Sequence, residues 1–414
     1  MTDLDEAARA VLRANDRGGY TVPTAGLYPY QWNWDSAFAA WGFATFDTDR
    51  AWLEVETLMA GQWPSGMVPH ILFHRPDPGY FPGPEVWGPV PGPIPSSGIS
   101  QPAVAASAVA RIWALDPDRA RLAALFPRLL AWHRWWMGWR VSAGGAAFIT
   151  HPWEAGRDNA PDWDGGMAAL DPSGIAPYQR RDTGHVDAAM RPTQADYDRY
   201  VWLVERGRRL AWDDAALARD CPLRIADPTV HFILLRAMRD LRTLAAALGA
   251  DGAEIAAWIA RLEAGASELW NPATGAYDAR DLLTGRFAGC VSNASFLAWW
   301  AGLDAADMLP TLQRILAASP HPVPSHDPAS PRFEPRRYWR GPVWGILNCL
   351  IATGLAEQGH ATLAERIRAA TAALIEAHGF AEYFDPETGA PAGGGHFTWT
   401  AAIWLTWASP TAAR

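Results

Sequence analysis

The chain has 414 residues, of which 49% are apolar, and its 35 basic and 44 acidic side chains give a formal charge of −9. This composition allows a large buried core, and the acidic balance, without a long run of Lys or Arg, argues against nucleic acid as the main partner. The N-terminus is acidic where a secretory signal is basic, and no apolar run approaches the roughly 18 residues of a membrane span, so we expect a cytoplasmic protein without a membrane partner.

Apolar positions recur at helical spacing in about a dozen blocks along the chain. The blocks lie at 4–14, 35–46, 48–61, 103–115, 122–139, 197–212, 231–248, 255–269, 292–303, 343–356, 363–377 and 398–407. Runs of β-branched residues are scarce, so the pattern predicts an all-α fold. Paired helices joined by loops of unequal length favour an (α/α)6 barrel, a toroid of six inner and six outer helices with its long loops at one end. A helical solenoid is the alternative, but its repeats should show a fixed period.

Four long segments lack a helical period, at 62–100, 140–193, 318–341 and 378–397. The first is dense in Pro and Gly, yet its aromatic residues indicate a segment that packs, and structureless loops of this length are usually lids or binding loops. No shift in composition marks a domain boundary. We therefore expect one catalytic domain over 1–414, with lid or insert loops at 62–100 and 180–193.

Aromatic residues beside polar ones suggest a sugar ligand. The chain contains 24 Trp, and segments 28–35 (YPYQWNWD) and 338–344 (YWRGPVW) concentrate them. A Trp-x-Trp-Asp arrangement offers a stacking surface and a neighbouring acceptor, which match the apolar face and the hydroxyls of a pyranose. The alternative is two Trp residues in an ordinary core.

The segment 151–164 (HPWEAGRDNAPDWD) holds four carboxylates within an aperiodic, Trp-flanked loop. Hydrolysis of a glycosidic bond requires two carboxyl groups, one to protonate the leaving oxygen and one to activate water or attack carbon. Asp158 lies in the middle of the loop, where burial would raise its pKa enough to hold a proton. Glu154, Asp162 and Asp164 remain candidates for the same role, or bind hydroxyls or cap helices.

Glu382 is the candidate for the second carboxyl group. It lies in segment 379–389 (GFAEYFDPETG), another loop just before the last predicted helix. On pattern alone, a solvated loop carboxylate is the alternative.

Five motifs occur in order at 31–36 (QWNWDS), 100–102 (SQP), 153–161 (WEAGRDNAP), 338–342 (YWRGP) and 382–385 (EYFD). This set resembles the inverting α-glycosidases of glycoside hydrolase family 63, and within that family the bacterial mannosylglycerate and glucosylglycerate hydrolases. The resemblance covers about residues 20–407. It implies that Asp158 is the general acid and Glu382 the general base. It also implies that the pocket for the cleaved sugar is lined by Tyr28, Trp32, Trp34, Asp35, Gln101, Tyr338, Trp339 and Trp344, with Arg340 as a further candidate for holding hydroxyls.

The same resemblance points to a site for the leaving group. Segment 180–197 is similar to the loop by which glycerate-specific members hold the substrate carboxylate, and Arg191 and Tyr197 are the matching positions. An arginine fork suits a planar anion because it forms two parallel charge-assisted hydrogen bonds. The alternative is a surface Arg and a Tyr packed on a helix. His396 stands where such relatives place a polar amide, so it either replaces that amide or signals another leaving group.

The sequence therefore predicts hydrolysis of glucosylglycerate or mannosylglycerate with inversion, and leaves open which hexose is cleaved. An α-glucosidase acting on a disaccharide such as trehalose or kojibiose is one alternative. A sugar epimerase on the same toroid is another, although it would need a histidine pair that is not evident. The expected partner is a small-molecule sugar. The oligomeric state is open, and a homo-oligomer is allowed.

No cofactor or metal is expected. The chain lacks the Asp-x-Asp-x-Asp-Gly loop of a calcium site. Its three cysteines, Cys221, Cys290 and Cys349, are widely spaced and form no metal-ligand pattern, so we expect reduced, buried thiols.

Overall fold

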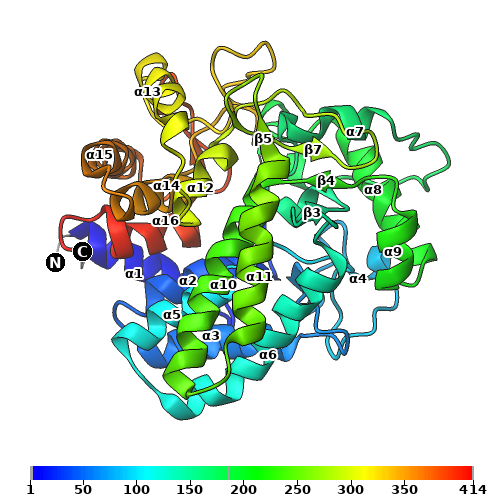
Figure 1. Ribbon diagram of the computed structural model, residues 1–414, viewed down its shortest axis with the longest axis horizontal. Helices are drawn as coiled ribbons and strands as arrows, with labels where there is room; N and C mark the ends of the chain where they lie inside the picture. The colour runs from blue at the N-terminus through cyan, green and yellow to red at the C-terminus, as the bar shows by residue number, and fades with distance from the viewer. Residues whose placement is uncertain (1–2, 185, 413–414) are drawn as a thin grey trace.

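The computed structural model describes residues 3–184 and 186–412, and helices dominate this described part. Six helices form an inner ring in which each contacts the next, and α16 contacts α2 to close the circle. Figure 1 shows the long helices gathered on one side of the molecule, with the shorter elements of the long loops on the other. In order around the ring, the inner helices are α2 (Asn33–Phe43), α5 (Ala105–Leu115), α10 (Pro228–Leu248), α12 (Leu297–Trp300), α14 (Gly345–Glu357) and α16 (Thr398–Ile403).

Six further helices lie outside this ring, which confirms the predicted (α/α)6 barrel. The first outer helix contacts both α2 and α16, so the two ends of the chain meet. There the Asp5 carboxylate accepts hydrogen bonds from the Trp404 indole and the Ser409 hydroxyl, each at 2.8 Å. The outer helices are α1 (Asp3–Asn15), α3 (Thr48–Ala60), α6 (Arg119–Trp139), α11 (Ala253–Gly265), α13 (Leu309–Ala318) and α15 (Ala361–His378).

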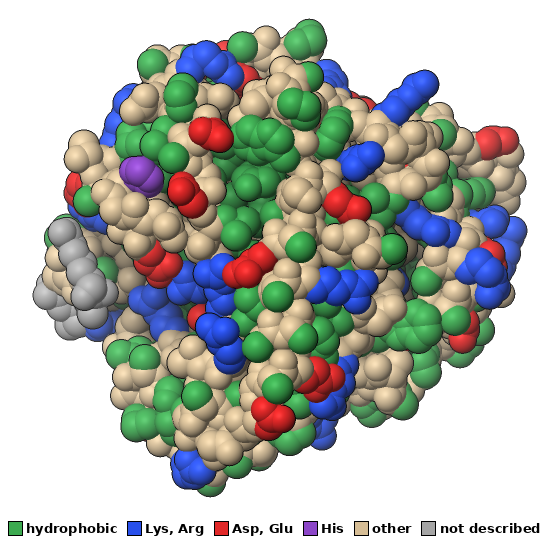
Figure 2. All heavy atoms as spheres, viewed as in Figure 1, with side chains coloured by type: hydrophobic (Ala, Val, Ile, Leu, Met, Phe, Trp, Pro, Cys, Tyr) green, Lys and Arg blue, Asp and Glu red, His purple; other side chains and the backbone are tan. Residues whose placement is uncertain are grey.

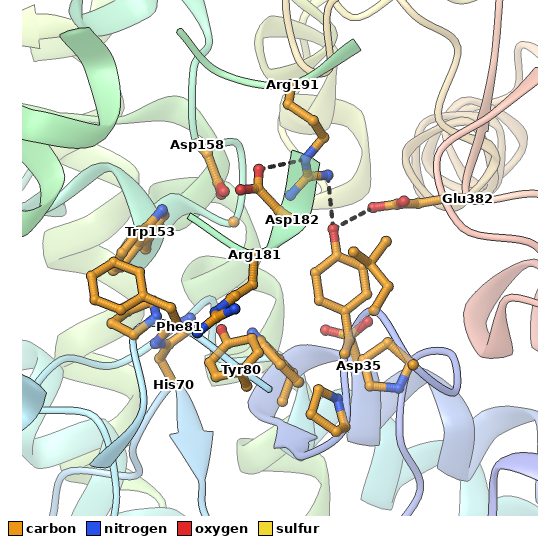
Figure 3. A pocket seen from close by; sticks show the side chains of 18 of the residues that line it. Asp35, His70, Tyr80, Phe81, Trp153, Asp158, Arg181, Asp182, Arg191 and Glu382 are labelled. Carbon is orange, nitrogen blue, oxygen red and sulfur yellow. Dashed lines mark hydrogen bonds and ion pairs between the residues drawn. The ribbon is translucent and has the colours of Figure 1, made fainter. Parts of the chain in front are cut away.

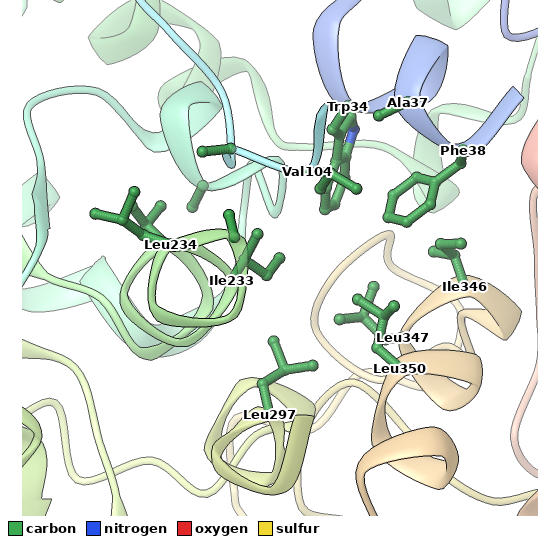
Figure 4. Close-up of a cluster of buried hydrophobic side chains, with 14 of the residues drawn as sticks. Trp34, Ala37, Phe38, Val104, Ile233, Leu234, Leu297, Ile346, Leu347 and Leu350 are labelled. Carbon is green, nitrogen blue, oxygen red and sulfur yellow. The ribbon is translucent and has the colours of Figure 1, made fainter. Parts of the chain in front are cut away.

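The apolar core lies between the inner helices. Figure 4 shows Phe38 of α2, Ile233 of α10, Leu297 of α12 and Leu347 of α14 pointing toward a common centre. All eleven residues of α2 are buried, because this helix has ring neighbours on two sides and an outer helix behind it. An inner helix is therefore apolar around much of its circumference, whereas an outer helix buries one stripe. None of the described helices combines the length and the apolar character needed to cross a membrane.

Two assignments of individual helices differ from the sequence prediction. The predicted block 197–212 corresponds to α8 (Gln194–Arg209), which lies among the loop elements with α4 and not in the ring. The outer layer is instead completed by α13, a helix that the sequence pattern does not predict. Both segments are amphipathic, and periodicity shows that a helix has an apolar face without showing which layer covers that face.

The long loops carry short elements. These are the helices α4 (Pro84–Trp87), α7 (Asp164–Ala168), α8 and α9 (Asp214–Asp220), and several 3-10 turns. Antiparallel strand pairs fasten the loops to one another. They are β1 (Gln31–Trp32) with β2 (Ile71–Leu72), β4 (Ile225–Ala226) between β3 (Phe148–Ile149) and β7 (Arg280–Asp281), β5 (Trp270–Asn271) with β6 (Ala276–Tyr277), and β8 (Tyr383–Phe384) with β9 (Pro391–Ala392).

The molecular surface agrees with the charge pattern of the sequence. On the face shown in Figure 2, acidic and basic side chains are interspersed and do not gather into one large patch. This face therefore offers no basic stripe of the kind that follows a nucleic-acid backbone.

Candidate active site

A cavity of about 290 Å³ lies where the inner helices begin, beneath the long loops. Its walls come from the residues just before or at the start of α2, α5, α14 and α16 and from the segments 62–100 and 140–193. The structure thus brings together side chains that are distant in sequence, such as Tyr28 and Glu382, which are 354 residues apart. Ten of the predicted site residues line this cavity: Tyr28, Trp32, Trp34, Asp35, Gln101, Asp158, Arg191, Tyr197, Tyr338 and Glu382.

The loop at 151–164 uses three of its four carboxylates to hold its own shape. Glu154 pairs with buried Arg140 at 3.1 Å, Asp162 pairs with buried Arg157 at 2.7 Å, and the Asp164 carboxylate accepts two hydrogen bonds from Arg340, each at 2.9 Å. Of the four, only Asp158 lines the cavity. The ion pairs therefore distinguish Asp158 from the other three candidates.

Gly156 turns this loop toward the cavity. Its φ is +68°, and a Cβ atom there would lie 2.5 Å from the Trp34 ring. Only glycine satisfies both conditions. After the turn, the Asp158 carbonyl accepts hydrogen bonds from the Tyr200 hydroxyl at 2.8 Å and the Trp163 indole at 2.9 Å, which hold the backbone of the acid in place.

Burial raises the pKa of Asp158 to about 7, and the nearby Glu382 carboxylate adds to the rise while Arg191 opposes it. At neutral pH a substantial fraction of this carboxyl group therefore holds its proton. Among the described residues, none forms an ion pair with Asp158 or with Glu382. Both carboxyl groups therefore remain available to a ligand.

Glu382 is almost fully buried, with 1% of its surface exposed. Its Oε1 accepts a hydrogen bond from the Tyr28 hydroxyl at 3.0 Å and a longer one from Tyr338 at 3.4 Å, and its Oε2 accepts from the Gly394 backbone N–H at 2.8 Å. Burial raises the pKa of Glu382, whereas Arg191 and these hydrogen bonds favour the ionised form and limit the rise. The site thus gives two carboxyl groups different surroundings.

Arg191 connects the two halves of the site. Its Nη1 donates to the Tyr28 hydroxyl at 2.9 Å, its Nε donates to Asp182 at 3.1 Å, and its guanidinium lies 4.2 Å from the centre of the Tyr338 ring. Figure 3 shows Arg191 with Asp158 on one side and Glu382 on the other. The Tyr28 hydroxyl joins Arg191 to Glu382 through one hydrogen bond to each. One cation therefore acts on both carboxyl groups.

Asp35 is a third carboxyl group in the same cavity. Burial, together with the nearby Glu382 and Asp158, raises its pKa well above the usual range. Beside it, the Trp34 backbone N–H donates to the Gln101 side chain at 3.3 Å, which fixes that amide. A protonated carboxyl group and an amide in an aromatic wall form a polar patch suited to sugar hydroxyls.

The prediction that Trp339 and Trp344 line the sugar pocket is not met, because neither is among the cavity residues. Their rings stack on each other with centroids 3.7 Å apart and an interplanar angle of 3°, and both are fully buried. The Trp344 indole donates to the Tyr338 carbonyl at 3.0 Å. The pair therefore supports Tyr338 from behind.

Two other predicted sugar contacts also lie away from the cavity wall. Arg340 is occupied by Asp164 and by Glu334, whose carboxylate lies 2.9 Å from its Nε. His396 is exposed and sits at φ 48° in the turn before α16, while its neighbour Phe397 lines the cavity. The sequence pattern located these loops correctly but could not show which side chains point inward.

Sequence reasoning missed several residues that the long loops supply. His70, Tyr80 and Phe81 come from segment 62–100, and Arg181 and Asp182 come from segment 180–193, whose residue His185 lies outside the described part. The cluster of aromatic residues at 73–87 was the available signal. Both segments border the cavity, and their movement as lids stays a prediction.

Comparisons with known proteins agree on one family. The family model described as "Mannosylglycerate hydrolase MGH1-like glycoside hydrolase domain" matches residues 28–400. The chain is 46% identical to mannosylglycerate hydrolase MGH1 of Selaginella moellendorffii, covering 97% of this chain and 85% of that protein. It is 44% identical to the mannosylglycerate hydrolase of Thermus thermophilus, covering 96% and 98%. A crystal structure of the glycoside hydrolase family 63 mannosylglycerate hydrolase from Thermus thermophilus in complex with Tris and D-glycerate superposes with a TM-score of 0.93 at 44% identity, covering 97% and 98%.

Proposed function

The chain belongs to the mannosylglycerate hydrolase MGH1-like glycoside hydrolases, and we propose that it hydrolyses mannosylglycerate to mannose and D-glycerate with inversion at the anomeric carbon. The observation that carries this proposal is the placement of Asp158 and Glu382 in one cavity, with Arg191 acting on both. Inverting glycosidases need such a pair, one protonated and one ionised.

In the proposed reaction, Asp158 gives its proton to the glycosidic oxygen while the bond from that oxygen to the anomeric carbon breaks. Glu382 removes a proton from a water molecule, whose oxygen forms the new bond to the anomeric carbon from the opposite face. Tyr28 and the Gly394 N–H hold the Glu382 carboxylate through hydrogen bonds of 3.0 and 2.8 Å. Asp158 ends ionised and Glu382 protonated, and exchange with solvent restores both.

Other residues of the cavity would bind the two parts of the substrate. Trp34 and Asp35 would hold the hexose through stacking and hydrogen bonds, and Arg191 and Tyr197 would face the carboxylate of glycerate. The cavity of about 290 Å³ is just below the range of about 300–1,000 Å³ for small-molecule sites. A glycoside the size of a disaccharide suits this volume better than a polysaccharide chain.

The test is turnover of a substrate panel followed by NMR. Mannosylglycerate, glucosylglycerate, trehalose and kojibiose are each incubated with the enzyme, and we expect free mannose and glycerate from the first at the highest kcat/KM. Greater activity on a disaccharide would refute the glycerate assignment. Appearance of an isomerised sugar would instead indicate an epimerase, against which the cavity argues because His70 is the one histidine among its described lining residues.

A further inference from the structure

Segment 31–36, which runs from β1 into the first turn of α2, supplies the wall of the cavity proposed for the hexose. Three of its side chains line the cavity: Trp32, Trp34 and Asp35. Figure 3 shows Asp35 at the start of α2 among these lining side chains. The two end residues, Gln31 and Ser36, have no exposed surface and do not line the cavity. The Gln31 amide donates to the Ser36 hydroxyl at 2.9 Å, so the ends of the segment are joined to each other.

Glu54, on the outer helix α3, binds both ends of this segment. Its side chain has no exposed surface and is not among the residues that line the cavity. Its Oε1 accepts a hydrogen bond from the Ser36 hydroxyl at 2.5 Å and a longer one from the Gln31 amide at 3.4 Å. Positions 31 and 36 flank the three lining side chains, so one carboxylate holds the segment on either side of them.

The Glu54 carboxylate is itself held in place from the outer layer of the barrel. The Thr21 hydroxyl donates to its Oε2 at 2.7 Å, and the Thr21 backbone N–H donates to its Oε1 at 3.1 Å. Arg50 Nη2 lies 2.7 Å from Oε2, and the same guanidinium donates two hydrogen bonds of 2.9 Å to Asp16. Hydrogen bonds to ionised groups are stronger than those between neutral groups. The carboxylate is therefore a fixed point from which segment 31–36 can be oriented.

The same network reaches segment 62–100 through Gln31. The His74 Nε2 donates to the Gln31 side-chain oxygen at 2.7 Å, and the His74 ring stacks on Tyr20 with centroids 4.2 Å apart. Burial lowers the pKa of His74 to about 4, so the imidazole is neutral at pH 7. Both polar ends of the Gln31 amide are thus bonded, which fixes the direction of its donor toward Ser36 and Glu54.

We propose that Glu54 is a positioning residue for the reaction, which acts by fixing segment 31–36. Its contacts set the orientation of Trp34 and Asp35 toward the hexose. A displacement of about 1 Å at a group that positions the substrate can reduce the rate about 10²-fold. The inference rests on the proposed function, because it assigns the hexose to this wall and glycerate to another. Loosening the segment should therefore weaken binding of the hexose and leave binding of glycerate unchanged.

Two hydroxyl deletions around the same carboxylate give a matched comparison. Ser36→Ala removes the donor that comes from the segment to Oε1, whereas Thr21→Val removes the donor that comes from the loop after α1 to Oε2. These two variants, Glu54→Gln and wild type are compared by Tm, by kcat and KM for mannosylglycerate, and by the inhibition constants of mannose and D-glycerate. The kinetics are measured at a temperature at which each variant is folded.

We expect Ser36→Ala to raise the inhibition constant of mannose about tenfold and to lower kcat/KM about 10- to 100-fold, while that of D-glycerate changes less than about twofold. Thr21→Val should lower Tm by a similar amount and keep the wild-type kinetics. Glu54→Gln should reproduce the kinetic change of Ser36→Ala. Should Glu54→Gln fail to fold, the two hydroxyl variants decide alone.

Three results would overturn the inference and leave the proposed function intact. They are wild-type kinetics in Ser36→Ala, an equal rise of both inhibition constants in that variant, and the same kinetic change in Thr21→Val as in Ser36→Ala. Each would show that the network supports the fold without orienting the hexose. A wild type that releases no mannose from mannosylglycerate would overturn the proposed function and this inference with it.

Discussion

Asp158→Asn should remove activity and at the same time stabilise the fold at alkaline pH. Burial raises the pKa of Asp158 from 3.8 to about 7, which corresponds to about 4 kcal/mol of folding stability lost as the carboxyl ionises. The stability is present below pH 4, where the unfolded chain is also protonated, and is lost as the pH rises to about 7. Because Asp158 is only partly buried from solvent, we expect about half of this figure, about 2 kcal/mol.

An asparagine at position 158 has no charge to bury, so the variant should gain this stability at pH 8 and much less of it at pH 5. For a chain of this length the gain corresponds to a rise in Tm of about 2 °C. Thermal unfolding at the two pH values measures it, and kcat should fall about 10²- to 10⁴-fold. A variant less stable than wild type at pH 8, or a gain that does not depend on pH, would refute the reasoning.

Asp162→Asn is the matched control from the same loop. Arg157 lies 2.7 Å from this carboxylate and holds its pKa below the usual value although burial opposes it. In this variant the buried Arg157 keeps, among the described residues, only its longer ion pair with Asp227, at 3.2 Å. We therefore expect a loss of part of the about 3–5 kcal/mol that breaking a buried ion pair costs. The two neighbouring substitutions should therefore change stability at pH 8 in opposite directions.

Four further outcomes are expected. Glu382→Gln should lower kcat about 10²- to 10⁴-fold, and azide should restore turnover by giving a glycosyl azide of inverted configuration; an azide product of retained configuration would count against a general base. The kcat/KM profile of wild type should fall above about pH 7 as Asp158 ionises, and a flat profile through pH 9 would contradict the acid assignment. Tyr28→Phe removes a donor to Glu382, so the acidic limb of that profile should move to higher pH; an unmoved limb would refute this role. Arg340→Met breaks the pair with Asp164 and should cost about 1 kcal/mol of stability with KM unchanged, and a large rise in KM would return Arg340 to the site.

Much of the fold could be predicted from the helical spacing of apolar residues within short stretches of the sequence. Eleven of the twelve predicted helical blocks correspond to inner or outer helices of the (α/α)6 barrel. The misassigned pair, α8 and α13, shows the limit of periodicity. Each has an apolar face, but whether that face packs on the ring or on a loop layer depends on contacts made by residues distant in sequence.

The candidate site, like the fold, could be predicted only in part from the sequence. Four carboxylates in segment 151–164 looked equivalent because their partners, Arg140, Arg157 and Arg340, lie outside the loop or turn back across it. Only the folded chain shows that these arginines leave Asp158 unpaired. In the same way, Tyr338 and Trp339 are adjacent in sequence, yet the former lines the cavity and the latter packs behind it.

The most direct test of the account is the configuration of the first-formed sugar, followed by ¹H NMR before the anomers equilibrate. A water molecule activated by Glu382 attacks from the face opposite the departing glycerate, so an α-mannoside should yield β-mannose first. Initial release of α-mannose would show retention of configuration, and would contradict the assignment of Asp158 as acid and Glu382 as base in a single displacement.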